Sequence, residues 1–362
     1  MKKIRYAVVG AGWISQEAFL PAVEQTGNSE VAAIVSGNAA NAKQLADFHG
    51  IKDVYSYEQF DAMARSSTVD AVYIATPNSS HAHYAERAAK HRLHILVEKP
   101  LATTAAEAES MVAAAKDAGV NLATAYRLHN DPGTIQVMEL IRDGAIGDPR
   151  YFSSCFCFQI AAGNHRLKKD HWGGPLQDLG VYCVNAARHA FAGEPIEVHA
   201  LSGSDRIDPR FSEVDGAISA TMRFDGGRIA TFYAGFGADA IDMFQVVGTR
   251  GSVELQHAYR FDARRTLLLK RGEALERIDI PQTDNFSGMI AYFSDCILAG
   301  TRPLVDSAEG LADMRVLLSI VDASARGASV RLTSERPFTP LQRSMSRSFP
   351  LARRKLVLSR PA

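Results

Sequence analysis

The sequence predicts a doubly wound α/β domain of the Rossmann type, followed by an α+β domain with an open, mostly antiparallel sheet. Three observations support this prediction. An apolar run near the N-terminus breaks into Gly-x-Gly, residues up to about 125 alternate short apolar runs with amphipathic stretches, and residues from about 195 to 280 are mostly β-like. Strands that alternate with helices indicate a parallel sheet, whereas strands joined by tight turns indicate an antiparallel one.

The bulk composition is that of a globular protein. The chain has 362 residues, of which 46% are hydrophobic and 22% charged, so we expect two domains. The formal net charge of zero gives no reason to expect a nucleic-acid or membrane partner. No apolar run approaches the roughly 20 residues that span a bilayer, so we expect a cytoplasmic protein. The four cysteines contain no Cys-x-x-Cys pair, so we expect buried thiols and no metal.

The first strand, expected at 4–9, leads through a glycine turn into a helical pattern. Gly10 permits a tight turn, and Gly12 lets the backbone approach the pyrophosphate of a dinucleotide. The helix that follows offers free N–H groups and the positive end of its dipole. Ser15, where a third glycine or alanine is usual, is small enough for close packing of helix on strand. We expect cofactor contacts from Gly10, Gly12, Trp13 and Ile14.

The other elements follow from the same periodicities. In the first half we expect strands at 30–36, 71–75, 94–97 and 121–124, and helices at 39–49, 79–91 and 104–118. In the second half we expect helices at 132–143, 176–191, 286–299 and 308–325, and strands at 150–158, 197–201, 217–224, 228–234, 243–248, 252–256, 266–270 and 276–280. Asp225-Gly226-Gly227 is a hairpin signal.

These elements divide the chain into three parts. We expect a dinucleotide-binding domain at 1–125, a substrate and oligomerisation domain at 126–335, and a basic tail at 336–362. One face of the second sheet should carry helices, and the other should pair with a second subunit, since a large bare apolar face tends to mark an interface. The tail is expected to be mobile or draped on the surface, with a partner-embracing arm as the alternative.

The end of the second strand indicates which dinucleotide binds. An NAD enzyme usually places Asp or Glu here to bind the ribose 2′-hydroxyl. This chain has Ser36, followed by Gly37 and Asn38, with Lys43 further along the next helix. A hydroxyl and a nearby cation favour a 2′-phosphate, so we expect NADP. The alternative, that Lys43 only points into solvent, stays open.

Glu98-Lys99-Pro100 directly follows the strand at 94–97. The proline ends the strand and restricts Lys99 to an extended conformation. Lys99 then lies at the carboxyl edge of the sheet, where ligands of such sheets bind. A lysine after a strand is more often plain surface, but its place between Glu and Pro at this edge favours a catalytic role.

Asp178 and Tyr182 stand four apart on the helix expected at 176–191, so they share a face. Two dry, unpaired polar groups on such a face would be costly. Either they satisfy each other as structural groups, or they line a wet cleft. Asn185 and Arg188 continue the polar side, and His189 is better explained as a packed or surface histidine than as a catalyst.

In their order along the chain, these motifs resemble the Gfo/Idh/MocA oxidoreductase family, and within it the glucose–fructose oxidoreductase branch. The resemblance covers residues 3 to about 335. It is carried by the segments 7–12, 35–39, 70–74, 77–79, 98–100 and 178–182, together with His81, Tyr126, Arg127, His129, Asp131, Pro132, Asn185, Gly193, Glu194 and Pro195.

The resemblance implies an NADP-dependent enzyme that oxidises an aldose at C1 to a lactone. It implies that Lys99 contacts substrate and the nicotinamide ribose, that Tyr182 is the acid–base group, and that Asp178 orients sugar hydroxyls. The loop before Gly173 differs from that branch and is expected to help to shape the sugar pocket; it carries His165, Arg166, Lys168, Lys169, His171 and Trp172. Also implied are cofactor contacts from Thr76, Pro77, Asn78, His81, Glu98 and Arg127, substrate contacts from Arg127 and His129, and a homodimer or homotetramer formed through the second-domain sheet.

Three functions stay open at this point. Bound NADP could be turned over by a second sugar, which would close a two-sugar cycle. The protein could instead be a one-way sugar dehydrogenase or anhydro-sugar reductase with exchangeable NADP. A non-catalytic NADP sensor is the third option, and the presence of Lys99, Asp178 and Tyr182 together argues against it because a sensor needs no acid–base pair.

Overall fold

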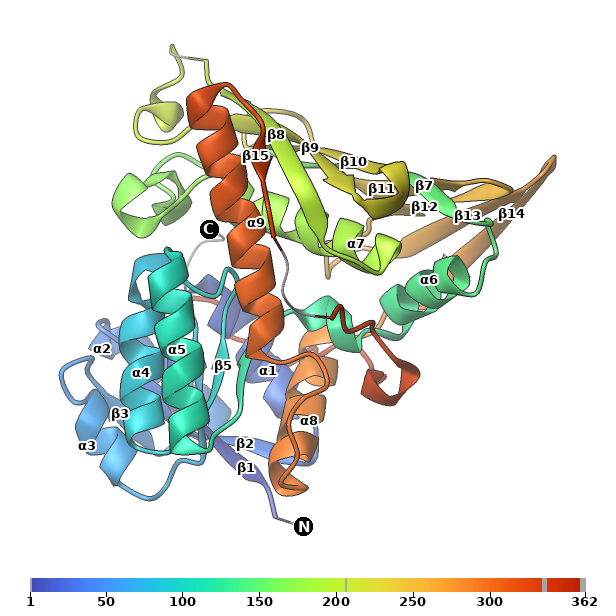
Figure 1. Cartoon of the computed structure of the whole chain (residues 1–362). Helices are drawn as coiled ribbons and strands as arrows, with labels where there is room; N and C mark the ends of the chain where they lie inside the picture. The colour runs from blue at the N-terminus through green and yellow to red at the C-terminus, as the bar shows by residue number, and fades with distance from the viewer. Residues whose placement is uncertain (1, 206, 334–336, 359–362) are drawn as a thin grey trace. The chain divides into compact units, whose positions relative to one another are not determined.

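The computed structural model describes residues 2–205, 207–333 and 337–358, and it divides into two compact units (Figure 1). Unit 1 is built from the described residues of Met1–Asp131, Thr283–Leu311 and Met345–Ala362. Unit 2 is built from those of Pro132–Gln282 and Ala312–Ser344. Residue 336 and residues 359–362 of the expected tail lie outside the described residues.

Unit 1 contains a six-stranded parallel sheet with the order β3-β2-β1-β4-β5-β6. The chain order reverses beside β1, so the switch point where such sheets bind dinucleotides lies between β1 and β4. Strands β4 and β5 consist almost wholly of buried apolar residues, as expected for central parallel strands. The strands are β1 (Ile4–Val9), β2 (Ser29–Val35), β3 (Asp53–Tyr55), β4 (Ala71–Ile74), β5 (His94–Val97) and β6 (Leu122–Thr124).

Helices connect these strands and cover the sheet of unit 1. Thr104 and Glu107 form a reciprocal capping box that fixes where α5 begins. The last helix of the unit, α8, comes from the distant segment after residue 283, and the Ser294 side chain hydrogen-bonds Tyr6 of β1 at 2.8 Å. The helices are α1 (Leu20–Val23), α2 (Ala39–His49), α3 (Phe60–Arg65), α4 (His81–Lys90), α5 (Ala105–Ala118) and α8 (Asn285–Leu298).

Unit 2 contains a nine-stranded sheet with the order β14-β13-β12-β11-β7-β10-β9-β8-β15. All its pairings are antiparallel except that of β7 with β10. The fold class predicted from the sequence is therefore confirmed for both sheets. The strands are β7 (Pro149–Cys157), β8 (Pro195–Gly203), β9 (Ala217–Phe224), β10 (Arg228–Gly235), β11 (Ile241–Gly248), β12 (Gly251–Gln256), β13 (Arg265–Arg271), β14 (Ala274–Ile280) and β15 (Val330–Arg331).

The two faces of this sheet differ in burial. Helix α7 (Val181–Phe191) lies along the buried face (Figure 1), where Phe152, Phe232 and Phe244 are covered. The turn before α7 approaches the sheet so closely that a Cβ at Gly180 would come within 3.3 Å of the Phe232 ring. The opposite face keeps large apolar side chains in solvent, namely Tyr151, Leu201, Ile229, Ile241 and Leu275. Helix α6 (Pro132–Arg142) precedes β7, and α9 (Ser307–Arg326) precedes β15.

Of the described tail, residues 337–344 belong to unit 2 and residues 345–358 pack on unit 1. Asn130 donates from Nδ2 to the Met345 carbonyl at 2.9 Å, and the Asp284 amide donates to the Phe349 carbonyl at 3.0 Å. The Arg347 guanidinium pairs with Asp295 of α8 at 2.9 Å. Among the described residues, no helix combines the length and the apolar character that a membrane crossing requires.

Candidate active site

The glycine turn after β1 is held against the start of the β4 loop. Gly10 has φ +95°, and a Cβ there would lie 2.6 Å from the Ala75 carbonyl oxygen, so only glycine fits. A Cβ at Gly12 would meet nothing within 4 Å, and Gly12 is exposed. The turn is therefore tightly packed at Gly10 and open at Gly12, where a pyrophosphate needs close approach to the backbone. Trp13 and Ile14 follow it, half-buried.

A π-helical turn, η1 (Ser15–Phe19), starts the helix after the glycine turn. The Ser15 hydroxyl donates to the Gly10 carbonyl at 2.6 Å, and Ser15 is fully buried. The Gln16 amide donates to the Ala11 carbonyl, also at 2.6 Å. Both side chains bond carbonyl groups of the turn and so fix its backbone. The amides at the start of the helix stay available to an anion. These residues fit a dinucleotide.

At the end of β2, Ser36 is buried and its hydroxyl oxygen accepts from the Asn38 amide at 3.2 Å. The Asn38 side chain in turn caps α2 by accepting from the Asn41 amide at 3.0 Å. Gly37 is exposed and lies against the Tyr57 ring. Lys43 is largely exposed and pairs with Asp47 on the helix surface at 3.1 Å. The structure therefore gives Lys43 a surface partner, which favours the alternative that it points into solvent.

The loops after β4 and β5 are joined by a buried histidine. Both ring nitrogens of His81 face backbone carbonyls, that of Pro100 at 2.9 Å and that of Thr76 at 3.1 Å. Burial lowers the pKa of His81, so a neutral ring donates to one of these carbonyls at a time. His81 thus connects the two loops through buried hydrogen bonds and fixes the shape of the site. Pro77 and Asn78, which follow Thr76 in the segment after β4, are half-buried.

Glu98 and Lys99 stand at the carboxyl edge next to the switch point. The Tyr73 hydroxyl donates to Glu98 at 2.6 Å, and the Lys99 amide donates to the same carboxylate at 3.3 Å. Burial raises the pKa of the Glu98 carboxyl, and the nearby Lys99 ammonium partly opposes that rise. Lys99 is half-buried at the end of β5, where the sequence predicts it.

Arg127 lies deeper than a ligand-contacting residue needs to. It is 5% exposed in the short turn η3 (Arg127–Asn130), and it donates to the Asn285 side chain at 3.1 Å. Asn285 in turn donates to Asp131 at 2.7 Å, and Thr283 donates to the same carboxylate at 2.9 Å. This buried chain of polar groups ties the segment after β6 to the start of α8. The role of Arg127 as a cofactor or substrate residue stays a prediction.

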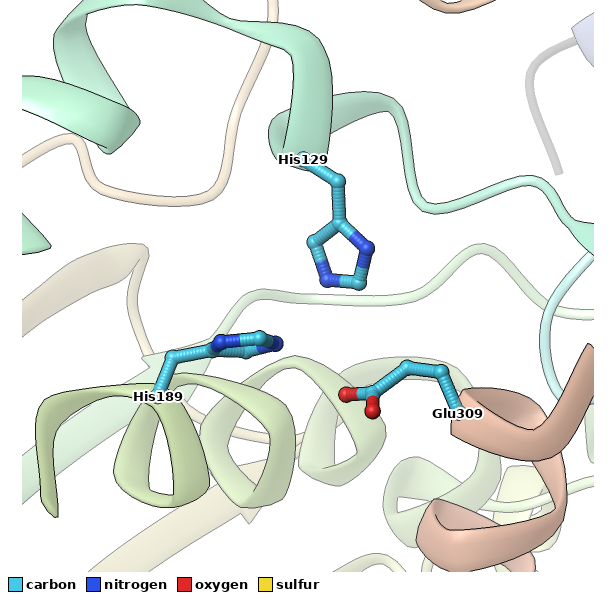
Figure 2. Close-up of side chains that lie close together, drawn as sticks. All are labelled: His129, His189 and Glu309. Carbon is cyan, nitrogen blue, oxygen red and sulfur yellow. The ribbon is translucent and has the colours of Figure 1, made fainter. Parts of the chain in front are cut away.

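His129 of η3 and Glu309 in the first turn of α9 both belong to unit 1, and their potential ligand atoms lie within 4.8 Å of each other (Figure 2). Both residues are buried. His189, also drawn in Figure 2, belongs to α7 of unit 2.

In unit 2, the segment from Gly174 to Phe191 is buried except at two positions. These are Asp178 and Tyr182, the pair that the sequence predicts for the substrate side. Asp178 lies in a second π-helical turn, η6 (Leu176–Gly180), and Tyr182 in the first turn of α7. A helix packed on all other sides therefore presents two polar side chains at its only open positions. This supports the cleft alternative over a purely structural pair.

Asp178 has a charged partner that sequence reasoning did not assign. The Arg166 Nε lies 3.0 Å from the Asp178 carboxylate, and their side chains are 22% and 14% exposed. The Arg166 backbone is itself fixed, because its carbonyl accepts from the Gly174 amide at 2.8 Å and its amide donates to the Asn164 side chain at 2.8 Å. A Cβ at Gly173 would lie 2.1 Å from the Arg166 carbonyl oxygen. Only the paired glycines would have indicated this close approach.

The aromatic residues near this pair differ in their roles. Tyr182 packs against Phe156 and Tyr259, with ring centroids at 5.9 and 5.8 Å. Tyr259 is fully buried and its hydroxyl lies 2.8 Å from that of Ser154, so it supports the Tyr182 ring from the sheet. Trp172 is half-buried and has φ +51°, which is uncommon for a bulky residue and often accompanies a functional loop.

The polar side of α7 continues into a buried charge network. Arg188 is fully buried between Asp313, at 2.5 Å, and Glu194, at 2.6 Å, and Asn185 donates to Asp313 at 2.8 Å. A fully buried guanidinium paired with two carboxylates is a structural group, so these residues fix α7 in place. His189 is 6% exposed and packs beside Phe338, in accordance with the expectation of a packed histidine.

Comparison with known proteins identifies the family. Residues 4–126 match the model of the oxidoreductase family with an NAD-binding Rossmann fold, and residues 134–254 match that of the GFO/IDH/MocA C-terminal domain. The chain belongs to the GFO/IDH/MocA oxidoreductase family.

Individual relatives resemble the chain over nearly its whole length. The D-xylose 1-dehydrogenase [NADP(+)] of Haloarcula marismortui is 32% identical over 91% of this chain and 93% of its own. The aldose-aldose oxidoreductase of Caulobacter crescentus, solved with glycerol, is 35% identical with a TM-score of 0.87, and the match covers 91% of this chain and all of that one. The 3-ketoreductase KijD10 of Actinomadura kijaniata, solved with NADP and TDP-benzene, is 27% identical with a TM-score of 0.82 over 89% and 98%. The family, the enzyme class and the NADP cofactor predicted from the sequence are thereby confirmed.

Proposed function

We propose that the protein is an NADP-dependent sugar oxidoreductase that oxidises an aldose at C1 to a lactone. The observation that carries the proposal is the pair Asp178 and Tyr182, the two open positions of an otherwise buried segment. The packed Gly10 and open Gly12 of the other unit support a dinucleotide site. Among the relatives, the names of the xylose dehydrogenase and the aldose-aldose oxidoreductase support an aldose substrate.

NADP, held by the glycine turn and the ends of β2, β4 and β5, would accept hydride from the sugar carbon. Tyr182 removes the proton of the C1 hydroxyl. A phenol is a poor base near neutrality because its ordinary pKa is about 10, and an ammonium group beside it favours the phenolate. Lys99, half-buried at the end of β5, is the cation that we assign to the sugar and the nicotinamide ribose. Asp178 accepts hydrogen bonds from sugar hydroxyls and orients the ring, while Arg166 fixes the orientation of the carboxylate.

The reverse direction uses the same groups. Protonated Tyr182 can deliver its proton to the oxygen of a second sugar carbonyl, and retained NADPH would return the hydride to the carbon, which would close a two-sugar cycle. An exchangeable cofactor would make the protein a one-way dehydrogenase or an anhydro-sugar reductase. The two cases share every residue named above and differ only in how fast NADP leaves.

The experiment that tests the proposal begins with the protein as purified. Denaturation and chromatography of the supernatant should release NADP or NADPH. Intact protein loaded with NADP should then develop reduced-nicotinamide fluorescence when an aldose such as xylose or glucose is added, and lose it when a second aldose is supplied in excess. A broad panel of aldoses that never changes the fluorescence of a loaded protein would contradict the proposal and restore the sensor alternative.

We also propose that the bare face of the unit 2 sheet is covered by a second copy of the chain. In register, Tyr151 of β7 stands beside Ile229 of β10, and Leu201 of β8 lies on the same face. Leu201 is 67% exposed, which is costly for an apolar side chain in a single copy. Sedimentation of the purified protein should show a dimer or tetramer, and Leu201→Glu should shift it towards the monomer.

A further inference from the structure

The C-terminal tail follows one helix of unit 1 towards the glycine turn. Arg354 pairs with Glu24, at the C-terminal end of α1, and bonds the Phe48 carbonyl at the end of α2. Lys355 pairs with Glu17, which lies earlier on the same helical segment, in η1. The tail therefore runs against the direction of this segment, from its end to its beginning.

In its described part, the tail is bonded to the glycine turn through the Gln16 side chain. The Leu358 amide donates to Gln16 Oε1 at 2.6 Å, and Gln16 Nε2 donates to the Ala11 carbonyl at 2.6 Å. Gln16 is fully buried and uses both ends of its amide in this way. Ala11 lies between Gly10 and Gly12, so one side chain connects the tail backbone to the centre of the turn.

The tail is also anchored along its length. The Ala352 amide donates to Asp284 at 3.1 Å, the Gln25 side chain donates to the Pro350 carbonyl at 2.9 Å, and the Arg354 guanidinium stacks over the Phe48 ring at 4.5 Å. Leu356, Val357 and Leu358 are half-buried. The contacts are spread along the tail, before, within and after the basic residues 353–355. The segment therefore has a defined path rather than a single point of attachment.

A tail that merely covered the surface would not need contacts along a defined path. Each residue that the tail orders costs about 1–2 kcal/mol of chain entropy, so contacts that only decorate a surface are not enough to fix a path of this length. The described part of this path reaches the glycine turn, whose backbone must hold its shape for a pyrophosphate to bind. Bonds to Gln16 oppose any opening of the turn that would let a bound anion leave.

We propose that residues 347–358 are a part of the dinucleotide site, in which Leu358 and Gln16 lock the glycine turn and slow the release of NADP(H). Gln16 is a positioning residue, because it acts through the Ala11 carbonyl. The proposal rests on the dinucleotide site of the proposed function but not on its sugar substrate. It favours the retained-cofactor cycle over the exchangeable one.

The test measures NADPH release without any sugar. Full-length protein is loaded with NADPH, mixed with a large excess of NADP in a stopped-flow instrument, and followed by nicotinamide fluorescence. Removing residues 353–362 should raise the release rate constant by about tenfold, equivalent to ~1.4 kcal/mol of binding free energy. Leu358→Pro, which keeps the tail but lacks the amide hydrogen, should raise it severalfold.

Arg353→Gln is the matched control, because Arg353 is exposed and its replacement removes one charge from the same segment. It should leave the rate constant unchanged. Thermal unfolding of every variant separates a lock from a merely stabilising strap. If the truncated protein and Leu358→Pro unfold at lower temperature but release NADPH at the wild-type rate, the proposal is wrong. Slow, tail-dependent release in a protein that oxidises no aldose would uphold it and reject the proposed function alone.

Discussion

Two π-helical turns begin the functional helices of the two units. Turn η1 follows Gly10 and Gly12 in unit 1, and turn η6 follows Gly173 and Gly174 in unit 2. Each is five residues long, and neither has a side-chain N-cap. Such turns are rare and often lie at functional sites. The resemblance ends there, because the two units use their turns for different chemistry.

Turn η1 leaves main-chain groups accessible to a ligand, whereas turn η6 leaves side chains accessible. In unit 1, Ser15 and Gln16 bond inward to carbonyls of the glycine turn, so the groups left for a ligand are main-chain amides. In unit 2, the segment buries everything except Asp178 and Tyr182. Under the proposed function, recognition of the cofactor therefore depends on a backbone shape, whereas chemistry on the sugar depends on two particular side chains. The predictions below test this division.

The largest effect is expected from Tyr182→Phe. The variant keeps the ring that packs against Phe156 and Tyr259 but lacks the oxygen that takes the proton. Turnover of an aldose should fall by roughly 10³-fold, within the usual range for loss of a general acid–base group. NADPH affinity, measured by fluorescence titration, should stay at the wild-type value. An unchanged kcat would remove Tyr182 from the mechanism.

The glycine turn gives the reciprocal test for unit 1. Gly10→Ala forces a Cβ to 2.6 Å from the Ala75 carbonyl oxygen at φ +95°, and we expect a loss of about 3 kcal/mol in the free energy of unfolding. In Gly12→Ala the added Cβ has no neighbour within 4 Å, so the free energy of unfolding should stay at the wild-type value. The substitution should nevertheless weaken NADPH binding by about tenfold, because its methyl group occupies the space of the phosphates. Equal stability of the two variants would contradict the packing argument.

These two glycines also show what a sequence can reveal. The Gly-x-Gly spacing after an apolar run reports a backbone requirement that recurs wherever a pyrophosphate meets a helix, so the strand, turn and helix were predictable. The assignment of α8 to unit 1 was not. Its residues follow the strands of unit 2 in the chain, and only long-range bonds such as Tyr6 to Ser294 draw them to β1. Short amphipathic patterns carry no information about such partners.

The substrate side shows the same limit. The spacing of Asp178 and Tyr182 placed them on one face, but nothing in the spacing predicted Arg166, which lies twelve residues before Asp178. A loop without periodicity can approach a helix in many ways. The close contact of Gly173 with the Arg166 carbonyl selects one of them, and it becomes visible only in three dimensions.

Arg166→Gln tests whether the loop takes part in recognition. Without the guanidinium, the partly buried Asp178 carboxylate loses its cation and its fixed orientation. We expect KM for an aldose to rise by roughly tenfold or more, in line with the loss of a charged hydrogen bond, with a smaller fall in kcat. Lys168→Gln, in the same loop, breaks only an exposed pair with Glu213 and is the matched control. Similar KM values for the two variants would show that loop charge, not Asp178 orientation, matters.

Ser36→Asp probes the side chain that we expect to favour NADP over NAD. A carboxylate at the end of β2 repels a 2′-phosphate and accepts from a 2′-hydroxyl, so the preference for NADP over NAD should fall by about tenfold. Competitive fluorescence titrations with both nucleotides measure this ratio. Lys43→Gln is expected to change it little, because Lys43 already pairs with Asp47 in solvent. A larger effect from Lys43 than from Ser36 would reverse the assignment.

The smallest effect concerns His81, which supports the unit 1 site from behind. Burial lowers its pKa below the ordinary value of about 6.5, so the unfolded chain binds a proton more readily than the folded one. The stability from neutral His81 is complete above that ordinary value and is lost as the pH falls towards the folded pKa. The free energy of unfolding, measured with urea between pH 8 and pH 5, should therefore fall less steeply with falling pH in His81→Gln than in wild type. The two slopes should differ by at most about 1.4 kcal/mol per pH unit. His83→Gln, an exposed histidine of the same helix, is the control, and equal slopes for His81→Gln and wild type would show that His81 does not couple stability to pH.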